Sequence, residues 1–156
     1  MHAPASDNAA RRQWMGLLAK SPAVLVTRLC TRLCKELSGL PAWDYLRRPE
    51  IGLVMVRGRM GGDGAPFNLG EMTVTRCSVR LESGLVGHAW VAGRSADHAC
   101  SAALADALLQ DPRWHPAVTK AVVAPLRDGL RDARDQASRK AAATRVDFFT
   151  LVRAED

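Results

Sequence analysis

The positions of apolar residues predict a helix near the start of the chain. Trp14, Leu17 and Leu18 lie three to four residues apart and would form one apolar stripe of that helix. Asp7 belongs to the residue types that cap a helix N-terminus, and the pattern continues to Lys20. We therefore expect a first helix that follows Asp7, after a flexible N-terminus of residues 1–6.

A second helix is predicted directly after the first. In Ser21-Pro22, serine is expected to cap the new helix and proline to fit its first turn. The leucines of this segment recur at every fourth position, at Leu25, Leu29, Leu33 and Leu37. Gly39 and Pro41 then end the helix.

The pattern next changes to that of β-strands. Residues 51–57 are rich in β-branched and apolar types, and residues 71–81 alternate between the two faces of a strand. The glycine-rich residues 61–66 form a turn cluster, and a tight turn at 82–84 leads to a returning strand at 85–91. Three short strands joined by tight turns predict an antiparallel meander.

Helical patterning returns after the meander. Ser95 or Asp97 would cap a helix that ends near Gln110, before Pro112. Residues 112–143 are also expected to be mainly helical. Three residues are expected to interrupt this region: Pro116, Pro125 and Gly129.

The C-terminal part of the chain carries two candidate contact surfaces. Residues 128–140 are densely charged, which favours a solvated helix, with a surface for an acidic partner as the alternative. The segment 146–152 is β-like and apolar, and we expect it to add to the sheet, to pack on its face or to insert into a partner. Its candidate partner residues are Phe148, Phe149, Leu151 and Val152. These patterns together predict one α+β domain over residues 1–156.

The composition fits a folded domain and leaves several partner classes open. The chain has 156 residues, of which 47% are hydrophobic and 24% charged, as in ordinary globular proteins. No apolar run is long enough to span a bilayer and no secretory signal is visible, so the expected compartment is the cytoplasm. The net charge is +6, and arginine supplies 18 of the 22 cations. Arginine suits phosphates, carboxylates and acidic proteins, and the charge alone selects none of them.

Five arginines lie in or beside the expected strands: Arg57, Arg59, Arg76, Arg80 and Arg94. If those of two strands lay opposite each other, they would form a surface able to meet a phosphate or an acidic subunit; a solvated sheet face is the alternative. The glycine-rich run 59–64 lacks the lysine, the hydroxyl residue and the following helix of a phosphate-binding loop, so it indicates a hairpin turn. Gly93-Arg94-Ser95, at a strand-to-helix junction, would either offer backbone N–H groups to an anion or serve only as a turn and helix cap.

Cysteines and histidines give no recognisable metal site. Cys30 and Cys34 lie four residues apart on the second helix, but no Cys-x-x-Cys pair and no zinc-finger histidine spacing occurs. We expect the four cysteines to be reduced and mostly buried apolar side chains. His88 and His98 flank the turn at Gly93 and could come close in space. Because no Ser-His-Asp order or paired-carboxylate motif is present either, the sequence predicts no metal site and no self-contained active site.

A set of short segments spans nearly the whole chain. They are Arg12-Gln-Trp-Met15, Arg59-Met-Gly-Gly62 with Gly64 and Phe67, Thr73-Val-Thr-Arg76, Gly87 with Trp90-Val91, Gly93-Arg94, His98-Ala99, Asp106-Ala-Leu108 with Gln110, Ala124-Pro-Leu126, and Arg145-Val-Asp-Phe-Phe-Thr150 with Val152-Arg153. In this order and at this length, the chain resembles PhnG, the family of G subunits of the bacterial carbon–phosphorus lyase system. The glycine-rich hairpin and the closing segment carry most weight.

The resemblance implies a role inside a larger enzyme. PhnG proteins are small subunits of a core complex with PhnH, PhnI and PhnJ, two copies of each, and act with PhnL in the first committed step of phosphonate breakdown. In that step the phosphonate displaces adenine from C1′ of the ATP ribose, which gives a ribose 1-phosphonate 5-triphosphate. The nucleosidase-type chemistry is associated with PhnI, and the iron–sulfur cluster and S-adenosylmethionine with PhnJ. The resemblance carries over no catalytic residue, so it implies a structural and positioning subunit that binds no cofactor alone.

Two further hypotheses concern the arginines. One places Arg59, Arg76 or Arg94 near the triphosphate of ATP in the complex. The other, from a different functional class, is a basic nucleic-acid-binding module that uses the strand arginines and residues 127–145. Against the second, aspartates dilute the basic helix, and the strands offer only Trp90 for stacking on bases.

Overall fold

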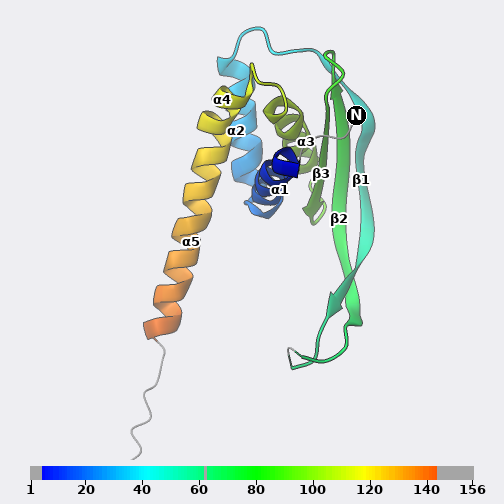
Figure 1. The fold of residues 1–156 in the computed structure, drawn as a ribbon, viewed down its shortest axis with the longest axis vertical. Coiled ribbons are helices and arrows are strands. Elements are labelled where there is room, and N and C mark those ends of the chain that lie inside the picture. The colour runs from blue at the N-terminus through cyan, green and yellow to red at the C-terminus, as the bar shows by residue number, and fades with distance from the viewer. Residues whose placement is uncertain (1–4, 62, 144–156) are drawn as a thin grey trace, which may run out of the picture.

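Helices and a three-stranded sheet make up the fold, and the computed structural model describes residues 5–61 and 63–143 (Figure 1). In chain order the elements are α1 (Ala5–Lys20), α2 (Ala23–Glu36), β1 (Trp43–Gly58), β2 (Phe67–Leu81), β3 (Val86–Ala92), α3 (Ala96–Leu109), α4 (His115–Val118), the π-helical turn η1 (Thr119–Val123) and α5 (Ala124–Ala143). The expected α+β class, with helices before and after an antiparallel meander, is confirmed. The β-like segment 146–152 lies outside the described residues.

The sheet has the strand order β1-β2-β3, and both pairs are antiparallel. β1 and β2 contain 16 and 15 residues, whereas β3 contains seven. The prediction of short strands was wrong for β1 and β2, because irregularities in both strands interrupt the alternation by which a strand is recognised. β3 pairs only with residues 74–80 of β2, so the first hairpin continues beyond the rest of the sheet.

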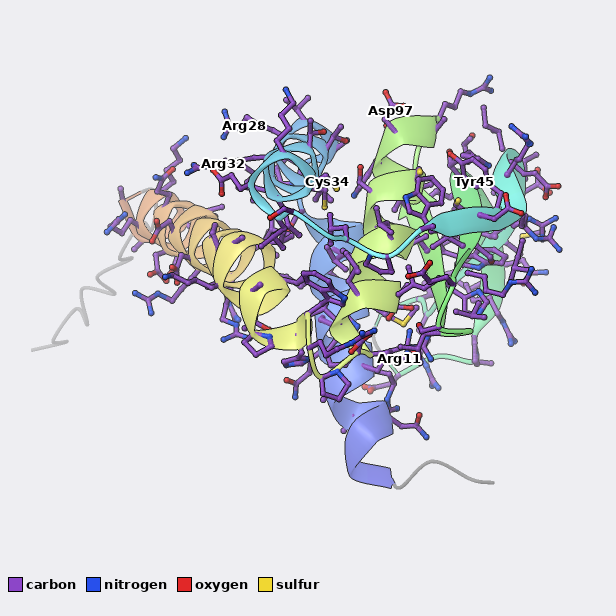
Figure 2. The ribbon with its side chains drawn as sticks, turned by 90° about the horizontal axis from the view of Figure 1, so that it is seen from above. Arg11, Arg28, Arg32, Cys34, Tyr45 and Asp97 are labelled. Atoms are coloured by element: carbon purple, nitrogen blue, oxygen red, sulfur yellow. The ribbon has the colours of Figure 1, made fainter. Side chains whose placement is uncertain are left out.

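One face of the sheet packs against the helices. The odd-numbered side chains of β2 from Thr75 to Leu81 point to this face and are buried, as their alternation predicts. Seen from above, α3 lies between the sheet and α2, and Tyr45 of β1 lies beside α3 (Figure 2). Each large apolar side chain that is fully buried in this core contributes about 1.5–3 kcal/mol.

The junction between α1 and α2 differs from the prediction. Ser21 does not cap α2, since its hydroxyl donates to the carbonyl oxygen of Leu17 at 2.8 Å and so closes the last turn of α1. Pro22 instead takes the N-cap position of α2, where the lack of an N–H removes no helix hydrogen bond. α1 begins at Ala5, so Asp7 lies inside the helix rather than before it; alanine, a strong helix former, extends the helix upstream of the expected cap.

Ser95 is the cap of α3, as predicted. Its hydroxyl oxygen accepts the backbone N–H of His98 at 3.3 Å. The His98 ring is buried, and its Nε2 lies 2.8 Å from the carbonyl oxygen of Leu18. His88 is exposed and lies 2.8 Å from the hydroxyl of Ser78. The two histidines do not meet, because His98 belongs to the helical layer and His88 to the opposite face of the sheet.

Residues 115–143 form a continuous helical run, which corrects the expectation of three interruptions. Pro116 lies in the first turn of α4, where a proline is tolerated. Before Pro125 the helix widens into η1, and this wider turn gives room for the proline ring. Gly129 lies within α5 without ending it, since glycine costs a helix interior only about 1 kcal/mol.

α5 runs away from the body of the molecule (Figures 1 and 2). Its residues 131–143 are exposed, in agreement with the expected solvated helix. None of the helices in the described part of the chain is long and apolar enough to cross a membrane.

Candidate partner interface

The first β-hairpin projects beyond β3 and beyond helices α1 to α3. Because β3 pairs only with residues 74–80, the strand residues farther along β1 and β2 have no other strand neighbours than each other among the described residues. Figure 1 shows this part of the hairpin extending past α1, α2 and α3. We name residues 51–73 the hairpin arm. Its register runs from Leu53 opposite Thr73 to Gly58 opposite Phe67, with one irregularity beside Arg57.

The hairpin arm carries large apolar side chains that the described part of the chain leaves uncovered. Seven of them are between 42% and 77% exposed: Ile51, Leu53, Met55, Met60, Phe67, Leu69 and Met72. A single exposed apolar residue is ordinary, whereas a group of them on one hairpin is typical of an interaction surface. Sequence reasoning missed this surface, although the apolar run of residues 51–56 was visible.

Several of these side chains continue the apolar face of the core. Ile51 lies directly opposite Thr75 and therefore points to the face of the sheet that α3 covers. Thr75 is fully buried, and its hydroxyl donates to the carbonyl oxygen of Gly93 at 2.7 Å, whereas Ile51 is 56% exposed. The helical layer thus covers β2 but not the neighbouring part of β1, and no element of residues 5–61 and 63–143 covers the continuation of the core surface on the hairpin arm.

The tip of the arm carries Arg59, the first of the predicted site residues. Gly61 adopts a φ of 66°, and the N–H of Gly64 donates to the carbonyl oxygen of Met60 at 3.3 Å. The Arg59 guanidinium donates to the carbonyl oxygen of Gly64 at 3.2 Å. The glycine-rich run is therefore a hairpin turn, as predicted, and Arg59 closes its base.

Arg76, the second predicted site residue, lies on the outer face of the sheet, away from the helices. Its guanidinium pairs with Glu50 at 3.1 Å and lies 5.7 Å from the ring centre of Trp90. Glu50 also accepts a hydrogen bond from Arg47 at 2.8 Å. The hydrogen bond from Arg47, followed by that from Arg76, holds the pKa of Glu50 below its ordinary value of 4.5. Part of the charge of Arg76 is thus balanced within the chain.

Arg94, the third predicted site residue, is exposed and follows Gly93, whose φ is 89°. The structure does not bring the three arginines together. Arg59 follows Gly58, which pairs with residue 67, nine strand positions from Arg76 and so ~30 Å away along the sheet. Arg94 lies at a level between them. The predicted partner residues of the tail lie outside the described residues: Phe148, Phe149, Leu151 and Val152.

A buried carboxylate for which the sequence predicts no role joins three elements. Asp106 of α3 is fully buried and accepts from Nε and Nη2 of Arg11 at 3.2 and 2.7 Å, from Nε1 of Trp14 at 2.8 Å and from the backbone N–H of His88 at 2.9 Å. These partners belong to α1 and β3. Because both carboxylate oxygens are already bonded and shielded from water, Asp106 stabilises the packing of the elements. An aspartate within the alanine- and leucine-rich residues 99–109 was the available signal.

Cysteines gather where α2, α3 and the sheet meet. The Sγ of Cys100 lies 3.2 Å from the Tyr45 hydroxyl. Burial raises the pKa of the Cys77 thiol from 9.0 to about 11 and that of Cys30 to about 12. These thiols are therefore protonated at neutral pH and are poor nucleophiles. Cys34 is exposed, which corrects the expectation for that residue. Within residues 5–61 and 63–143, no group of three or more His, Cys, Asp or Glu side chains is placed to hold a metal ion.

A cleft of about 590 Å³ opens between α1, α3 and α4. Its polar lining is largely engaged in contacts within the chain. Arg11 binds the buried carboxylate, Nε2 of Gln110 donates to the carbonyl oxygen of Val86 at 2.8 Å, and Nδ1 of His115 lies 2.7 Å from the carbonyl oxygen of Leu109. These groups hold the helices and β3 together, and the hairpin arm is the stronger candidate for a functional surface.

Comparison with known proteins agrees with the resemblance seen in the sequence. A family model described as "Phosphonate metabolism protein PhnG" matches residues 9–154. A relative from Rhizobium meliloti, named alpha-D-ribose 1-methylphosphonate 5-triphosphate synthase subunit PhnG, is 48% identical over 125 residues, which cover 74% of this chain and 79% of the relative. The family match takes in the helical layers and the hairpin arm alike. The chain therefore belongs to the PhnG family of phosphonate metabolism proteins.

Proposed function

We propose that this chain is a subunit of a ribose 1-methylphosphonate 5-triphosphate synthase and that its hairpin arm docks on a partner subunit. The name of the relative from Rhizobium meliloti supports the first part. The observation that carries the second part is the group of exposed apolar side chains on the arm, a surface suited to burial against another protein. In this proposal the chain positions its partners and contributes no complete active site of its own.

The proposed partners are PhnH, PhnI and PhnJ, two copies of each, with PhnL joining for the synthase reaction. A phosphonate oxygen bonds to C1′ of the ATP ribose while the bond from C1′ to adenine breaks, and adenine leaves with a proton. This chain binds no cofactor alone, and the iron–sulfur cluster and S-adenosylmethionine belong to PhnJ. Because ATP is the substrate, the proposed place of the reaction is the cytoplasm.

We further propose Arg59, Arg76 and Arg94 as candidate contacts for the triphosphate in the assembled complex, since guanidinium groups bind phosphate oxygens in a bidentate manner. Their separation along the sheet means that one triphosphate would not reach all three. In the complex, alanine at a true contact should raise the KM for ATP about tenfold or more, as expected for loss of a hydrogen bond to a charged group. A residue whose alanine variant leaves the ATP dependence unchanged is not a contact.

The nucleic-acid alternative has no specific observation in its favour. On the outer face of the sheet, the carboxylate of Glu50 already pairs with Arg76. The expectation that the strands offer only Trp90 for stacking was wrong, because β1 and β2 also carry the exposed rings of Trp43 and Phe67. These rings lie far apart, with Phe67 and Trp43 at opposite ends of β2 and β1, whereas proteins that bind single strands stack successive bases on successive rings. Aspartates alternate with arginines along α5 and weaken any basic stripe there.

Reconstitution of the synthase with and without this chain tests the proposed function. The remaining subunits are purified as a complex, and adenine release from ATP is measured in the presence of a phosphonate. We expect little release without the chain and recovery when it is added in stoichiometric amount. Full activity of the other subunits alone, or failure of the chain to join them, would contradict the proposal.

A further inference from the structure

We propose that the free edge of β1 in the hairpin arm accepts an extended segment of a partner subunit as a fourth strand of the sheet. This inference rests on the proposed function, because it states how the arm holds its partner. Besides contacting the apolar side chains of the arm, the partner segment would form backbone hydrogen bonds with β1, so it must be a β-strand rather than a helix or a loop.

β1 is an edge strand. In the strand order β1-β2-β3, β2 lies on one side of β1, and no strand of residues 5–61 and 63–143 lies on the other. The backbone N–H and C=O groups on the free side of such a strand form a template for pairing with another chain.

Two hydrogen bonds show how the backbone groups of β2 are directed. The N–H of Gly93 donates to the carbonyl oxygen of Thr73 opposite it at 2.9 Å, and the N–H of Glu82 donates to the carbonyl oxygen of Ala42 opposite it at 2.8 Å. Along a strand of an antiparallel sheet, successive residues direct their backbone N–H and C=O groups alternately to the neighbour on one side and to the neighbour on the other. Odd-numbered residues of β2 therefore direct their backbone groups to β3, and even-numbered residues direct theirs to β1.

The register transfers this alternation to β1. Gly52 lies opposite residue 74 and Val54 opposite residue 72, so the backbone groups of Gly52 and Val54 face β2. The backbone groups of the residues between and beside them, Ile51, Leu53 and Met55, face the free edge. Their side chains are also among the exposed apolar set of the arm. The stretch of residues 51–55 thus offers both backbone groups that β2 does not pair and apolar side chains that are exposed.

The two halves of β1 differ in how well their edge is protected. Register shifts on either side of Arg47 and a proline at Pro49 interrupt the edge in the first half. From Ile51 to Val56 the register is regular, and the sequence contains neither proline nor a charged residue. Natural edge strands are usually blunted by such devices, so this unprotected stretch is expected to be covered in the assembled state.

The charges around the edge favour a different subunit over a second copy. Arg48 lies on one side of the stretch, and Arg57 and Arg59 lie on the other. Among the described residues, none of these three has a carboxylate within ion-pair distance. A strand with apolar residues at its centre and carboxylates toward its ends would complement both the middle of the edge and its flanks.

A second copy would not provide this match. Two copies related by a two-fold axis pair through residues that share a face of the sheet. Pairing centred on Leu53 would place Glu50 opposite Val56, and pairing centred on Val54 would place Ile51 opposite Arg57. A charged side chain opposite an apolar one gains nothing. The proposed occupant is therefore an acidic-flanked apolar strand of another subunit.

Residue-resolved amide hydrogen exchange of the free chain and of the purified complex tests this inference. In the free chain, the amides of Gly52 and Val54 should be protected by β2, while those of Ile51, Leu53 and Met55 exchange fast. In the complex, exchange at these three edge amides should slow by at least about tenfold. If the complex forms and exchange at the three edge amides is unchanged, strand addition is wrong but the proposed function stands. If the chain forms no complex, the proposed function itself is wrong. Edge amides already protected in the free chain would show pairing within the chain or between copies, and either would also overturn the inference.

Two substitutions at one position give an independent test. Leu53→Ala keeps the backbone N–H and shortens the side chain, whereas Leu53→Pro also removes the N–H at the free edge. Proline is tolerated there in the free chain because that N–H has no partner in β2, and an unchanged Tm checks this. We expect Leu53→Pro to weaken binding to the complex at least about tenfold more than Leu53→Ala. Equal weakening by the two variants would contradict strand addition.

Discussion

Asp106 is the residue whose contacts explain most about how the body of the molecule is held together. Its carboxylate joins α3 to α1 through Arg11 and Trp14, and to β3 through the backbone of His88. A buried carboxylate with all these partners is costly to disturb, because each partner loses its acceptor when the carboxylate is removed.

We predict that Asp106→Ala lowers the free energy of unfolding by about 3 kcal/mol or more, since the Trp14 and His88 donors are left without an acceptor. Urea denaturation followed by circular dichroism measures the change. Asp128→Ala, which removes an exposed carboxylate on α5, is the control and should stay within about 0.5 kcal/mol of the original chain. Similar values for the two variants would contradict the structural role of Asp106.

Alkaline pH is predicted to destabilise the fold through the buried thiols. Burial raises the pKa of Cys77 from 9.0 to about 11 and that of Cys30 to about 12. Because the folded pKa lies above the unfolded one, this contribution to stability is complete below pH 9.0 and declines as the pH rises toward 11 and 12. Unfolding free energies measured in urea at about pH 8 and about pH 10.5 should show this decline.

Cysteine variants identify the source of this pH dependence. Cys77→Ala removes one titrating group and should reduce the loss of stability between the two pH values. Cys34→Ala, at an exposed position, should have a smaller effect on this loss of stability. The assignment to buried thiols is wrong if the two variants show the same pH dependence.

The positions of single residues were predicted well where a local sequence pattern determines them. They were predicted poorly where strand pairing or tertiary packing determines them. Arg59 and Arg94 could be placed in turns, and Arg76 on the outer face of a strand. Their distance from one another depends on strand register and strand length, which irregularities in both strands conceal. The structural role of Asp106 was missed because one charged residue in an apolar helix shows its burial only when the neighbouring elements are packed around it.

At the scale of elements, the contact between α3 and β3 depends on a residue without a side chain. A β-carbon at Gly87 would overlap the carbonyl oxygen of Ala103 and approach the backbone nitrogen of Ala107 at 2.5 Å. Because these are backbone atoms of a helix, they cannot move aside as a flexible side chain would. The absence of a side chain at Gly87 thus lets the helix pack directly on the strand.

Two glycine-to-alanine substitutions should therefore have opposite effects. Gly87→Ala should destabilise the chain by about 2 kcal/mol or more, through displacement of α3 from β3. Gly129→Ala, where a β-carbon meets nothing within 4 Å, should stabilise α5 by about 0.5–1 kcal/mol. Thermal unfolding of both variants measures the difference, and a destabilising Gly129→Ala or a neutral Gly87→Ala would contradict the packing described.

The helices and the meander could be predicted because apolar spacing determines them locally. The continuous helical run from α4 to α5 could not be predicted from the sequence, because it tolerates Pro125 only through the π-helical turn η1. Ser21 matched the pattern of a cap for α2, yet its hydroxyl bonds backward to Leu17. Short-range rules allow a serine to do either, and the meeting of α1 and α2 selects between them.

At the scale of the whole molecule, a packed body carries two projecting elements, the hairpin arm and α5 (Figure 1). The body contains Asp106, Gly87 and His98, whose contacts hold helices and strands together. These residues are also among those that carry the family resemblance. The arm contains Arg59, Phe67 and other residues of the same resemblance, but they have few contacts within the described chain. We attribute their role to contacts with partner subunits.

In the proposed function, the hairpin arm holds this subunit in the synthase complex. We would measure the amount of chain that remains in the purified complex after Leu53→Asp, with Val24→Asp as the matched control. Both side chains are exposed, 62% and 79%, so both variants should fold with nearly unchanged Tm, but only Leu53 lies on the arm. We predict that Leu53→Asp weakens binding at least about a hundredfold and is lost during gel filtration, while Val24→Asp stays in the complex at its normal ratio. Retention of the Leu53→Asp chain at full stoichiometry would show that the hairpin arm does not hold the subunit in the complex.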